Sequence, residues 1–317
     1  MEVYRDLSEF KTLKNAVVTA GTFDGVHLGH QAIIKHVVDY ASDSGGESVL
    51  VTFHPHPRIV LQPNCDLQLL TSIEERIALL SKTGLDHLII IPFDKEFSRL
   101  SSLEFVRDLL VNKIGTKKLI IGYDHHFGRN REGSFAHLKE FGPVYGFEVR
   151  EIPAQDVDSL KISSTQIRYA LEEGDVKLAQ KLLGHPYSLS GTVVEGKQLG
   201  RTIGFPTANL KVLENRKLIP KYGVYLAEVL FEIDGGVKSF FGMLNIGVKP
   251  TFGFEELTIE VNVFDFDGDL YGKQLDVVFI DRIRSEVKFN NIQELQAQLL
   301  IDKKQCLNII HTNTSSF

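Results

Sequence analysis

Cysteine is scarce in this sequence, and long apolar runs and an excess of positive charge are missing from it. The two cysteines, Cys65 and Cys306, lie far apart and outside any metal-ligand spacing, which argues against a disulfide framework and predicts a reducing compartment. No apolar run approaches the roughly 18 residues of a membrane span, and residues 1–15 lack the apolar region of a signal peptide. We therefore expect a cytoplasmic protein with no membrane partner.

The charge of the chain bears on its partners. With 35 basic and 41 acidic residues, the net charge is −6. Proteins that bind the phosphate backbone of nucleic acids present a basic surface, which this composition does not indicate. We therefore expect no nucleic-acid partner. The hydrophobic share of 43% is that of a globular protein, and 317 residues are enough for two domains.

The first half of the chain alternates short apolar runs with helical patterns. Strands are predicted at 16–18, 48–53, 88–91, 118–122 and 147–152. Helices are predicted from residue 28 to a stop at 44–46, and at 73–80, 102–114, 165–172 and 175–183, two of them with Ser-x-x-Glu capping boxes at Ser72 and Ser101. Prolines at 55 and 57 rule out regular structure just after the second strand. This alternation predicts an α/β domain with a doubly wound parallel sheet.

The second half has a period of two from about residue 184 onward. Strands are predicted at 188–194, 223–231, 238–246, 257–266 and 275–280, and a helix at 292–307. Asp234-Gly235-Gly236 is a hairpin signal between two of the strands. The pattern predicts an all-β domain, a small barrel or a sandwich, with a terminal helix.

Residues 19–30, TAGTFDGVHLGH, combine a glycine turn with two histidines. The pattern predicts a strand, a tight turn and the start of a helix, with His27 and His30 on one face beside the unpaired N–H groups of the first helical turn. Two imidazoles and a positive helix end favour a phosphate that gains negative charge during reaction. We therefore hypothesise chemistry at a phosphorus atom of a nucleotide. The alternative is a helix start with structural histidines.

Ligands of parallel sheets bind beyond the carboxyl ends of the strands, so the loops there should converge. One of them, ISSTQIR, places Ser163, Ser164 and Thr165 at a helix N-terminus, with Arg168 one turn further on. Hydroxyls, free N–H groups and a guanidinium favour phosphate oxygens. Ordinary helix capping with a solvated arginine is the alternative.

The number of histidines in these loops raises the question of zinc. They are His27, His30, His54, His56, His125 and His126. The segment HLGH lacks the glutamate of a metalloprotease helix, and neither cysteine is placed to help. We expect no zinc.

A glycine-rich loop and a glutamate are the candidates in the second half. The loop, GRTIGFPTAN, ends in the hydroxyl of Thr207 and the carboxamide of Asn209, oxygens that can ligate a Mg²⁺ with nucleotide phosphates, although glycine and proline also mark β-turns. Glu260 lies between Ile259 and Val261 on a predicted strand. It is either a solvent-facing strand residue or a base that orients an attacking hydroxyl.

Seven segments in order along nearly the whole chain are similar to motifs of the prokaryotic bifunctional riboflavin kinase/FMN adenylyltransferase family, the FAD synthetases. They are GTFDGVHLGH, TFHPHP, GYDHHFG and ISSTQIR in the first half, and GRTIGFPTAN, NIGVKPTFG and IEVNVFDFDGDLYG in the second. The resemblance implies an FMN adenylyltransferase domain with a nucleotidyltransferase fold over residues 1–184. It also implies a riboflavin kinase β-barrel domain over residues 185–317.

In the kinase domain, the resemblance implies that the 5′-hydroxyl of riboflavin attacks the γ-phosphorus of ATP. Glu260 is then the base, and Thr207 and Asn209 lie around Mg²⁺. Phosphoryl transfer needs mainly positioning and charge neutralisation, which fits so few groups. The implied ATP- and flavin-binding residues of this domain are Gly196, Lys197, Gly200, Arg201, Gly204, Pro206 and Arg284.

In the adenylyltransferase domain, the resemblance implies that the phosphate of FMN attacks the α-phosphorus of a second ATP, giving FAD and pyrophosphate. His27, His30, Ser164 and Arg168 then stabilise the α-phosphate and the leaving group. The implied ATP-binding residues are Gly21, Thr22, Phe23, Asp24, His27, His30, Ser163, Ser164, Thr165 and Arg168. The implied FMN-binding residues are His56, Pro57, Asp124 and Phe127.

Two alternative functions are compatible with the motifs. One is a chain that only adenylylates FMN and retains its kinase half for structure or flavin binding. The other is a flavin-responsive regulator that binds nucleic acid through its β domain, which the acidic charge opposes.

Overall fold

The computed structural model describes residues 1–122, 127–129, 132–152, 162–196, 199–251 and 254–314. The contacts between residues divide the chain into a first unit, Met1–Ser164, and a second unit, Thr165–Phe317. This division lies earlier than the boundary at residue 184 that the sequence predicts. The helices α6 (Ser164–Glu172) and α7 (Val176–Leu183) belong almost entirely to the second unit, where α7 contacts a barrel strand.

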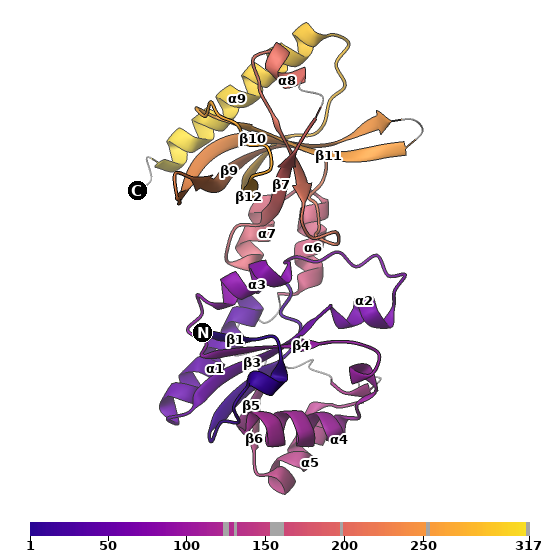
Figure 1. Cartoon of the computed structure of the whole chain (residues 1–317), viewed down its shortest axis with the longest axis vertical. Coiled ribbons are helices and arrows are strands. Elements are labelled where there is room, and N and C mark those ends of the chain that lie inside the picture. The colour runs from indigo at the N-terminus through magenta and orange to yellow at the C-terminus, as the bar shows by residue number, and fades with distance from the viewer. Residues whose placement is uncertain (123–126, 130–131, 153–161, 197–198, 252–253, 315–317) are drawn as a thin grey trace. The chain divides into compact units, whose positions relative to one another are not determined.

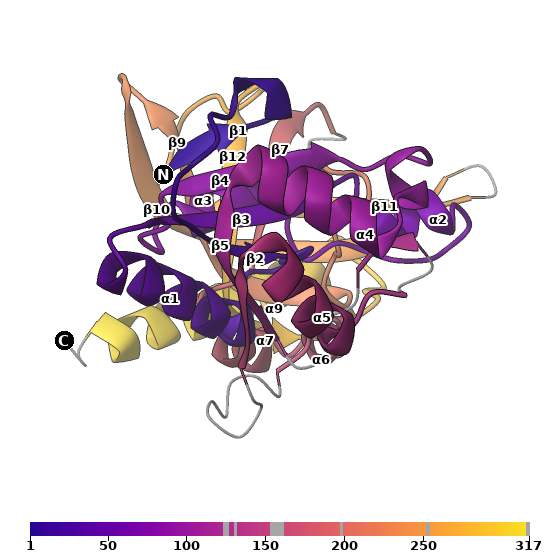
Figure 2. The same cartoon turned by 90° about the horizontal axis from the view of Figure 1, so that it is seen from below.

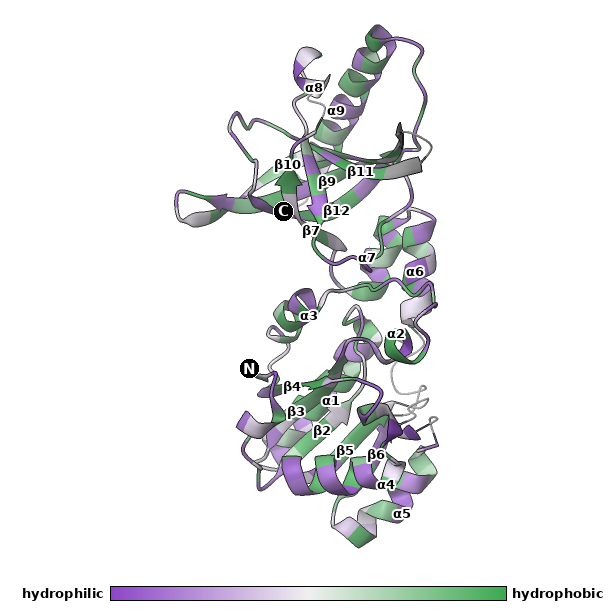
Figure 3. Ribbon diagram, turned by 45° about the vertical axis from the view of Figure 1, so that its right-hand side comes forward, coloured by the Kyte–Doolittle hydropathy of each residue, from purple (hydrophilic) through white to green (hydrophobic). Residues whose placement is uncertain are grey.

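The first unit contains a six-stranded parallel sheet with helices on both faces (Figure 1). In spatial order its strands are β1 (Glu2–Tyr4), β4 (His87–Pro92), β3 (Glu47–His54), β2 (Ala16–Ala20), β5 (Thr116–Gly122) and β6 (Glu148–Ile152). The central strands are strongly hydrophobic, as Figure 3 shows, because both faces are covered. The predicted doubly wound α/β fold is confirmed.

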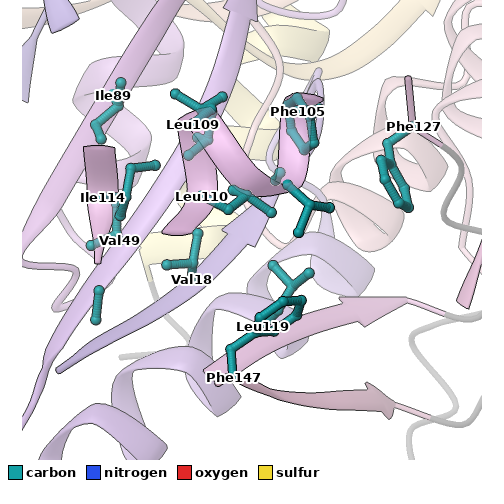
Figure 4. Close-up of a cluster of buried hydrophobic side chains, with 14 of the residues drawn as sticks. Val18, Val49, Ile89, Phe105, Leu109, Leu110, Ile114, Leu119, Phe127 and Phe147 are labelled. Atoms are coloured by element: carbon teal, nitrogen blue, oxygen red, sulfur yellow. The ribbon is translucent and has the colours of Figure 1, made fainter. Parts of the chain in front are cut away.

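The helices of this unit form the two outer layers. One face of the sheet packs against α1 (Leu28–Asp43) and α3 (Ile73–Leu80). The other packs against α4 (Ser102–Glu104), which continues as the π-helix η3 (Phe105–Ile114), and against α5 (Phe135–Tyr145). Figure 4 shows this second core, where Val18 and Leu119 of the sheet meet Phe105 and Leu110.

Local sequence signals set the ends of several helices. Ser72 and Ser101 each form the predicted capping box with the glutamate three residues later. The short helix α2 (Pro57–Leu61) corrects the expectation that the prolines exclude regular structure after β3. Pro57 occupies the first turn of this helix, where its missing N–H costs no hydrogen bond. Two single-turn 3₁₀ helices, η1 (Leu7–Glu9) and η2 (Phe97–Arg99), complete the unit.

The second unit is built on a closed antiparallel barrel of six strands (Figure 1). Around the barrel they are β10 (Gly236–Thr251), β11 (Phe254–Val263), β8 (Ala208–Val212), β7 (Ser188–Val194), β12 (Gln274–Arg284) and β9 (Gly223–Ile233). The one-turn helix α8 (Leu199–Thr202) precedes β8, and α9 (Ile292–Thr314) ends the chain. Closure decides between the predicted barrel and sandwich in favour of the barrel.

The hairpin and the terminal helix follow from the sequence as predicted. Asp234 and Gly235 have positive φ angles of 54° and 77° and join β9 to β10 as a two-residue turn. The apolar side of α9 packs against β10 and β12, where the core includes Leu226, Met243 and Cys306. The helix α9 spans Ile292–Thr314 and is longer than the predicted 292–307. Figure 2 shows its C-terminal turns, in yellow, next to the C-terminus of the chain.

Candidate active sites

The first candidate site lies where the strand order of the parallel sheet reverses. From β2 the chain proceeds outward through β3 and β4, and then returns to the other side of β2 as β5. Sheets of this kind bind ligands at this point, beyond the carboxyl ends of the strands. β2 ends at Ala20 and β5 at Gly122. The histidine loop, which we define as residues 21–30, begins at this position.

The backbone of the histidine loop is strained. Phe23, Gly25 and Val26 have positive φ angles of 48°, 87° and 41°. Side chains other than glycine rarely adopt this region, so the surrounding structure must hold the turn in place. One such contact is the hydrogen bond that the Gly25 N–H donates to the Thr71 hydroxyl at 3.1 Å.

Asp24 fixes the same loop from inside the protein, where its side chain is almost fully buried. Its carboxylate accepts hydrogen bonds from the backbone N–H groups of Leu70 and Thr71 at 3.0 Å, and from the Thr71 hydroxyl at 3.2 Å. Its backbone carbonyl accepts a hydrogen bond from the Ser164 hydroxyl at 3.1 Å. The structure thus brings Ser164 to the loop. The carboxylate of Asp24 contacts Leu70 and Thr71, and its role in ATP binding stays a prediction.

His27 and His30 form a stacked pair, with ring centroids 3.6 Å apart and planes inclined by 19°. His27 caps α1, because its Nδ1 accepts a hydrogen bond from the His30 N–H at 3.3 Å. A neutral imidazole that accepts at Nδ1 carries its proton on Nε2. The ring of Phe23 also contacts His30, with the two ring centroids 5.0 Å apart. Within the described residues, the buried Nδ1 of His30 has no hydrogen-bond partner.

Burial lowers the pKa of His30 well below 6.5, and the nearby His27 and Arg76 lower it further. His30 is therefore neutral at physiological pH. A neutral ring donates a hydrogen bond but supplies no net charge. The first turn of α1 begins beside the two rings, and the N-terminus of a helix is a feature that favours an anion such as a phosphate.

We expect acid to destabilise the first unit through His30. Its pKa is lowered in the folded state, so below about pH 6.5 the unfolded chain binds a proton that the native state does not, and stability falls as pH falls. Thermal unfolding between about pH 7.5 and about pH 5.5 should show a smaller loss of Tm in His30→Gln than in the parent protein. Equal losses would contradict the buried neutral ring.

The backbone of the histidine loop is also tied to the neighbouring strand. The Gly21 N–H donates to the Val51 carbonyl at 3.0 Å, and the Thr22 carbonyl accepts from the Thr52 hydroxyl at 3.1 Å. Of the predicted site residues in the segment ISSTQIR, Ser163 is exposed and lies in the first unit. Thr165 and Arg168 lie on α6 in the second unit, so their roles here stay predictions.

The predicted FMN-binding residues have different environments. His56 caps α2 by accepting a hydrogen bond from the Arg58 N–H at 3.1 Å, and Pro57 is the first residue of that helix. Phe127 is only 8% exposed and packs against Phe105, with ring centroids 5.7 Å apart. Its ring therefore lies in the core, and its contact with the flavin stays a prediction. Asp124 lies outside the described residues.

The second candidate site joins three side chains from distant parts of the chain. Glu260 on β11 pairs directly with Asn209 on β8 in the antiparallel register, so their side chains project from the same face. The Thr207 hydroxyl donates a hydrogen bond to Glu260 Oε2 at 3.3 Å. Carboxylate, hydroxyl and amide oxygens are hard ligands that suit Mg²⁺ together with phosphate oxygens. The structure therefore brings together the three residues to which the sequence assigns kinase chemistry.

The backbone of two glycines, Gly196 and Gly200, lies close to this cluster. A Cβ at Gly196 would lie 2.0 Å from Asn209 Nδ2, and one at Gly200 would lie 2.1 Å from the Phe205 carbonyl oxygen and 3.3 Å from Thr207 Oγ1. The two shortest contacts, at 2.0 and 2.1 Å, require the neighbouring atoms to shift. The backbone therefore approaches Asn209 at Gly196, and Phe205 at Gly200, more closely than any other residue type permits.

Gly196→Ala should impair the kinase site selectively. The added methyl group must displace the amide of Asn209, and a misplacement of about 1 Å at a catalytic group costs roughly 100-fold in rate. Kinetics of riboflavin phosphorylation would measure this loss. The matched control is Gly236→Ala, where no heavy atom lies within 4 Å of the new Cβ. Equal activity of the two variants would contradict the assigned position of Asn209.

Other predicted kinase residues shape the loop before β8. Gly204 has a φ of 79°, which favours glycine. The carbonyl of Pro206 accepts a hydrogen bond from Asn262 Nδ2 at 2.6 Å, and Asn262 itself is buried. Since Asn262 lies two residues after Glu260 on β11, this bond connects the loop that carries Thr207 to the strand that carries the glutamate.

Two of the basic residues predicted for the kinase, Arg284 and Arg201, lie in the described part of the structure. Arg284 pairs with the buried Asp302 of α9, its Nε and Nη2 lying 2.8–3.0 Å from the carboxylate oxygens. It therefore holds α9 to the barrel, and its role in substrate binding stays a prediction. Arg201 is exposed on α8. Lys197 lies outside the described residues.

Two further residues contact the segments that carry the predicted groups, Asn262 and Arg76. Asn262 is signalled only by its spacing of two from Glu260 on an alternating strand. Arg76 follows Ile73 and precedes Leu80 at helical spacing, on the side of α3 that is buried. The sequence therefore carries a signal for a buried arginine here, because a charged residue interrupts the apolar side of the helix.

Two searches of the described residues bear on metals and membranes. No group of three or more His, Cys, Asp or Glu side chains there is arranged to hold a metal ion. Across that same part of the chain, no helix combines the length and apolar character that crossing a membrane requires.

Comparison with known proteins agrees with this division of sites. Residues 9–166 match the FAD synthetase family, and residues 183–310 match the riboflavin kinase family. The first candidate site therefore falls in one matched segment and the second in the other.

Similarity to individual proteins extends over both segments. The bifunctional riboflavin kinase/FMN adenylyltransferase of Listeria monocytogenes is 40% identical over 292 residues, which cover 92% of this chain and 91% of that protein. The protein of the same name from Escherichia coli K12 is 37% identical over 290 residues, with coverage of 92% and 91%. A crystal structure described as a macrolide-efflux protein from Streptococcus pneumoniae has a TM-score of 0.84 and 34% identity, with coverage of 97% and 98%. The chain therefore belongs to the bifunctional riboflavin kinase/FMN adenylyltransferase family.

Proposed function

We propose that this chain makes FAD from riboflavin in two ATP-dependent steps. The barrel phosphorylates riboflavin, and the parallel-sheet unit adenylylates the resulting FMN. The observation that carries the proposal is that each unit gathers its own chemical groups, Thr207, Asn209 and Glu260 in one and the stacked His27 and His30 in the other. The two matched families follow the same order along the chain.

In the kinase step, a bond forms between the riboflavin 5′-oxygen and the γ-phosphorus of ATP, and the bond to ADP breaks. Glu260 takes the hydroxyl proton. The Thr207 hydroxyl, which donates to Glu260 Oε2, orients that carboxylate. Thr207 and Asn209 would hold Mg²⁺, which neutralises charge on the ATP phosphates when bound.

In the adenylylation step, an FMN phosphate oxygen bonds to the α-phosphorus of ATP and pyrophosphate leaves. This nucleophile is already anionic, so the site needs no strong base. The Nε2–H of His27 and the neutral ring of His30 are suited to donate hydrogen bonds to the oxygens on which charge develops. Ser164, which reaches the same loop through Asp24, and Arg168 complete the proposed set.

The proposal also includes the domain limits and the cellular location. We retain residues 1–184 and 185–317 as the catalytic domains, since the riboflavin kinase match begins at residue 183. Cys65 and Cys306 are both free thiols, which fits a cytoplasmic protein. ATP, riboflavin, FMN and FAD are the expected small-molecule partners.

Supplying the two flavin substrates separately tests the proposal. Riboflavin with Mg-ATP should give FMN and then FAD, and FMN with Mg-ATP should give FAD, as followed by chromatography. If FAD forms from FMN but no FMN forms from riboflavin, the chain is an adenylyltransferase only. If neither product forms and riboflavin is merely bound, the chain is a flavin-binding protein.

A further inference from the structure

A buried arginine, Arg76, contacts residues next to the histidine loop, and the proposed reaction assigns it no chemical step. Arg76 on α3 is 2% exposed. Its Nη2 lies 3.8 Å from Asp24 Oδ1, and its Nη1 donates to the Thr52 hydroxyl at 3.4 Å. Within the described residues its Nε has no hydrogen-bond partner. Since a guanidinium offers five N–H donors, Arg76 is poorly bonded for a fully buried cation.

Packing alone is a weak reason for a charge at this position. Asp24 already accepts hydrogen bonds from Leu70 and Thr71, and its ion pair with Arg76 is longer than a hydrogen bond. Burial lowers the pKa of Arg76, while Asp24 opposes this. A well-packed apolar side chain often serves at least as well as a buried ion pair. The arginine therefore calls for a role beyond filling the core.

The contacts of Arg76 lead to the strained turn of the histidine loop. Thr52, which accepts its hydrogen bond, donates to the carbonyl of Thr22. Asp24, whose carboxylate faces Nη2 of Arg76, lies two residues after Thr22 in the chain. Its backbone carbonyl accepts a hydrogen bond from the Ser164 hydroxyl. Arg76 therefore contacts residues 22–24 by two routes, immediately before the turn that places the two histidines.

The charge of Arg76 also acts on His30. Three causes lower the pKa of His30, namely its burial and the nearby side chains of His27 and Arg76. The negative charge that faces this cluster from the loop is Asp24, which is paired with Arg76 itself. Removing the cation from α3 should therefore make His30 easier to protonate.

We propose that Arg76 is a positioning residue for adenylyl transfer, which fixes residues 22–24 through Thr52 and Asp24 and so sets where the His30 ring lies. This inference rests on the proposed assignment of that reaction to the histidine loop. Arg76 touches no substrate in this account. It acts through the loop, and its effect belongs in kcat rather than in the KM for ATP.

Three variants test the role of Arg76. The double variant Asp24→Asn/Arg76→Met removes both charges and leaves no unpaired buried ion, Arg76→Lys retains the charge without the planar fork, and Arg5→Met is the control. Arg5 is an exposed arginine of the same unit, paired with Glu74. Riboflavin phosphorylation by each chain reports whether the second unit is intact.

We expect the double variant to lose about 30-fold or more in kcat for FAD formation from FMN, with the KM for ATP within about threefold. Arg76→Lys should lose less, and Arg5→Met should lose nothing. The pKa of His30, followed by NMR of its ring, should rise in the double variant and stay low in Arg76→Lys. A purely structural role would lower the unfolding temperature and leave kcat and this pKa unchanged.

The inference is overturned if the folded double variant forms FAD at the parent rate. Should that variant not fold, Arg76→Lys decides, and an unchanged kcat there overturns the inference equally. His30→Ala is measured alongside. If His30→Ala still forms FAD normally, the assignment of the site itself fails. If it is inactive while both Arg76 variants remain normal, only the inference about Arg76 fails.

Discussion

His30→Ala should lower the rate of FAD formation from FMN by about two to three orders of magnitude, the usual cost of losing a transition-state hydrogen-bond donor. Riboflavin phosphorylation by the same chain should be unchanged. The reason is that His30 lies in the histidine loop of the first unit, stacked on His27, while the kinase groups lie on the barrel. Chromatography with each flavin supplied separately measures both rates on one preparation.

His36→Ala is the matched control for this experiment. His36 is a second histidine of α1, and its ring stacks on Tyr40 away from the loop. We expect this variant to retain both activities. If His30→Ala lost riboflavin phosphorylation as severely as FAD formation, the model of two sites would be wrong. Loss of neither activity would show that His30 is a structural residue.

Glu260→Gln should have the opposite selectivity. The substitution preserves the shape of the side chain and removes the base, so riboflavin phosphorylation should fall by about 100- to 10,000-fold. FAD formation from added FMN should be unchanged. Initial rates of FMN formation, and of FAD formation from FMN, measure the two effects.

The control for Glu260→Gln is Glu232→Gln on β9, an exposed glutamate of the same barrel. It should retain full kinase activity. Normal FMN production by Glu260→Gln would show that the carboxylate is only a strand residue, as the alternative interpretation of the sequence holds. Equal loss in both glutamate variants would point to a general effect of charge on the barrel.

Much of the fold was predictable because local signals are strong in this chain. Capping boxes at Ser72 and Ser101 and the Asp234-Gly235 turn produce the expected structures at those positions. The missed elements have weak local signals. The helix α5 contains Gly142 and Pro143, and β8 is a five-residue strand directly after a glycine- and proline-rich loop.

Barrel closure was not predictable from periodicity, because alternation shows which side chains face inward but not which strands pair. Closure needs β12 to pair with both β7 and β9, and β11 to pair with β8. In each of these pairs the two strands are far apart in the sequence. The choice between barrel and sandwich therefore required the structure.

The sites divide in the same way. Histidine spacing on α1 is local, and the sequence predicted that His27 and His30 would share a face. The pairing of Glu260 with Asn209 depends on strand register, which the sequence alone does not give. The contact of Arg284 is likewise hidden from the sequence, since its guanidinium pairs with Asp302 on α9 and no local pattern reveals this partner.

The stoichiometry of the products is the most direct test of whether this chain catalyses both riboflavin phosphorylation and FMN adenylylation. Riboflavin and Mg-ATP are incubated with the parent protein, and ADP, pyrophosphate and FAD are quantified together. A chain with both activities gives one ADP and one pyrophosphate for each FAD made from riboflavin, and pyrophosphate without ADP when FMN is the substrate. If riboflavin gave neither ADP nor FMN while added FMN still gave FAD, the chain would not be bifunctional.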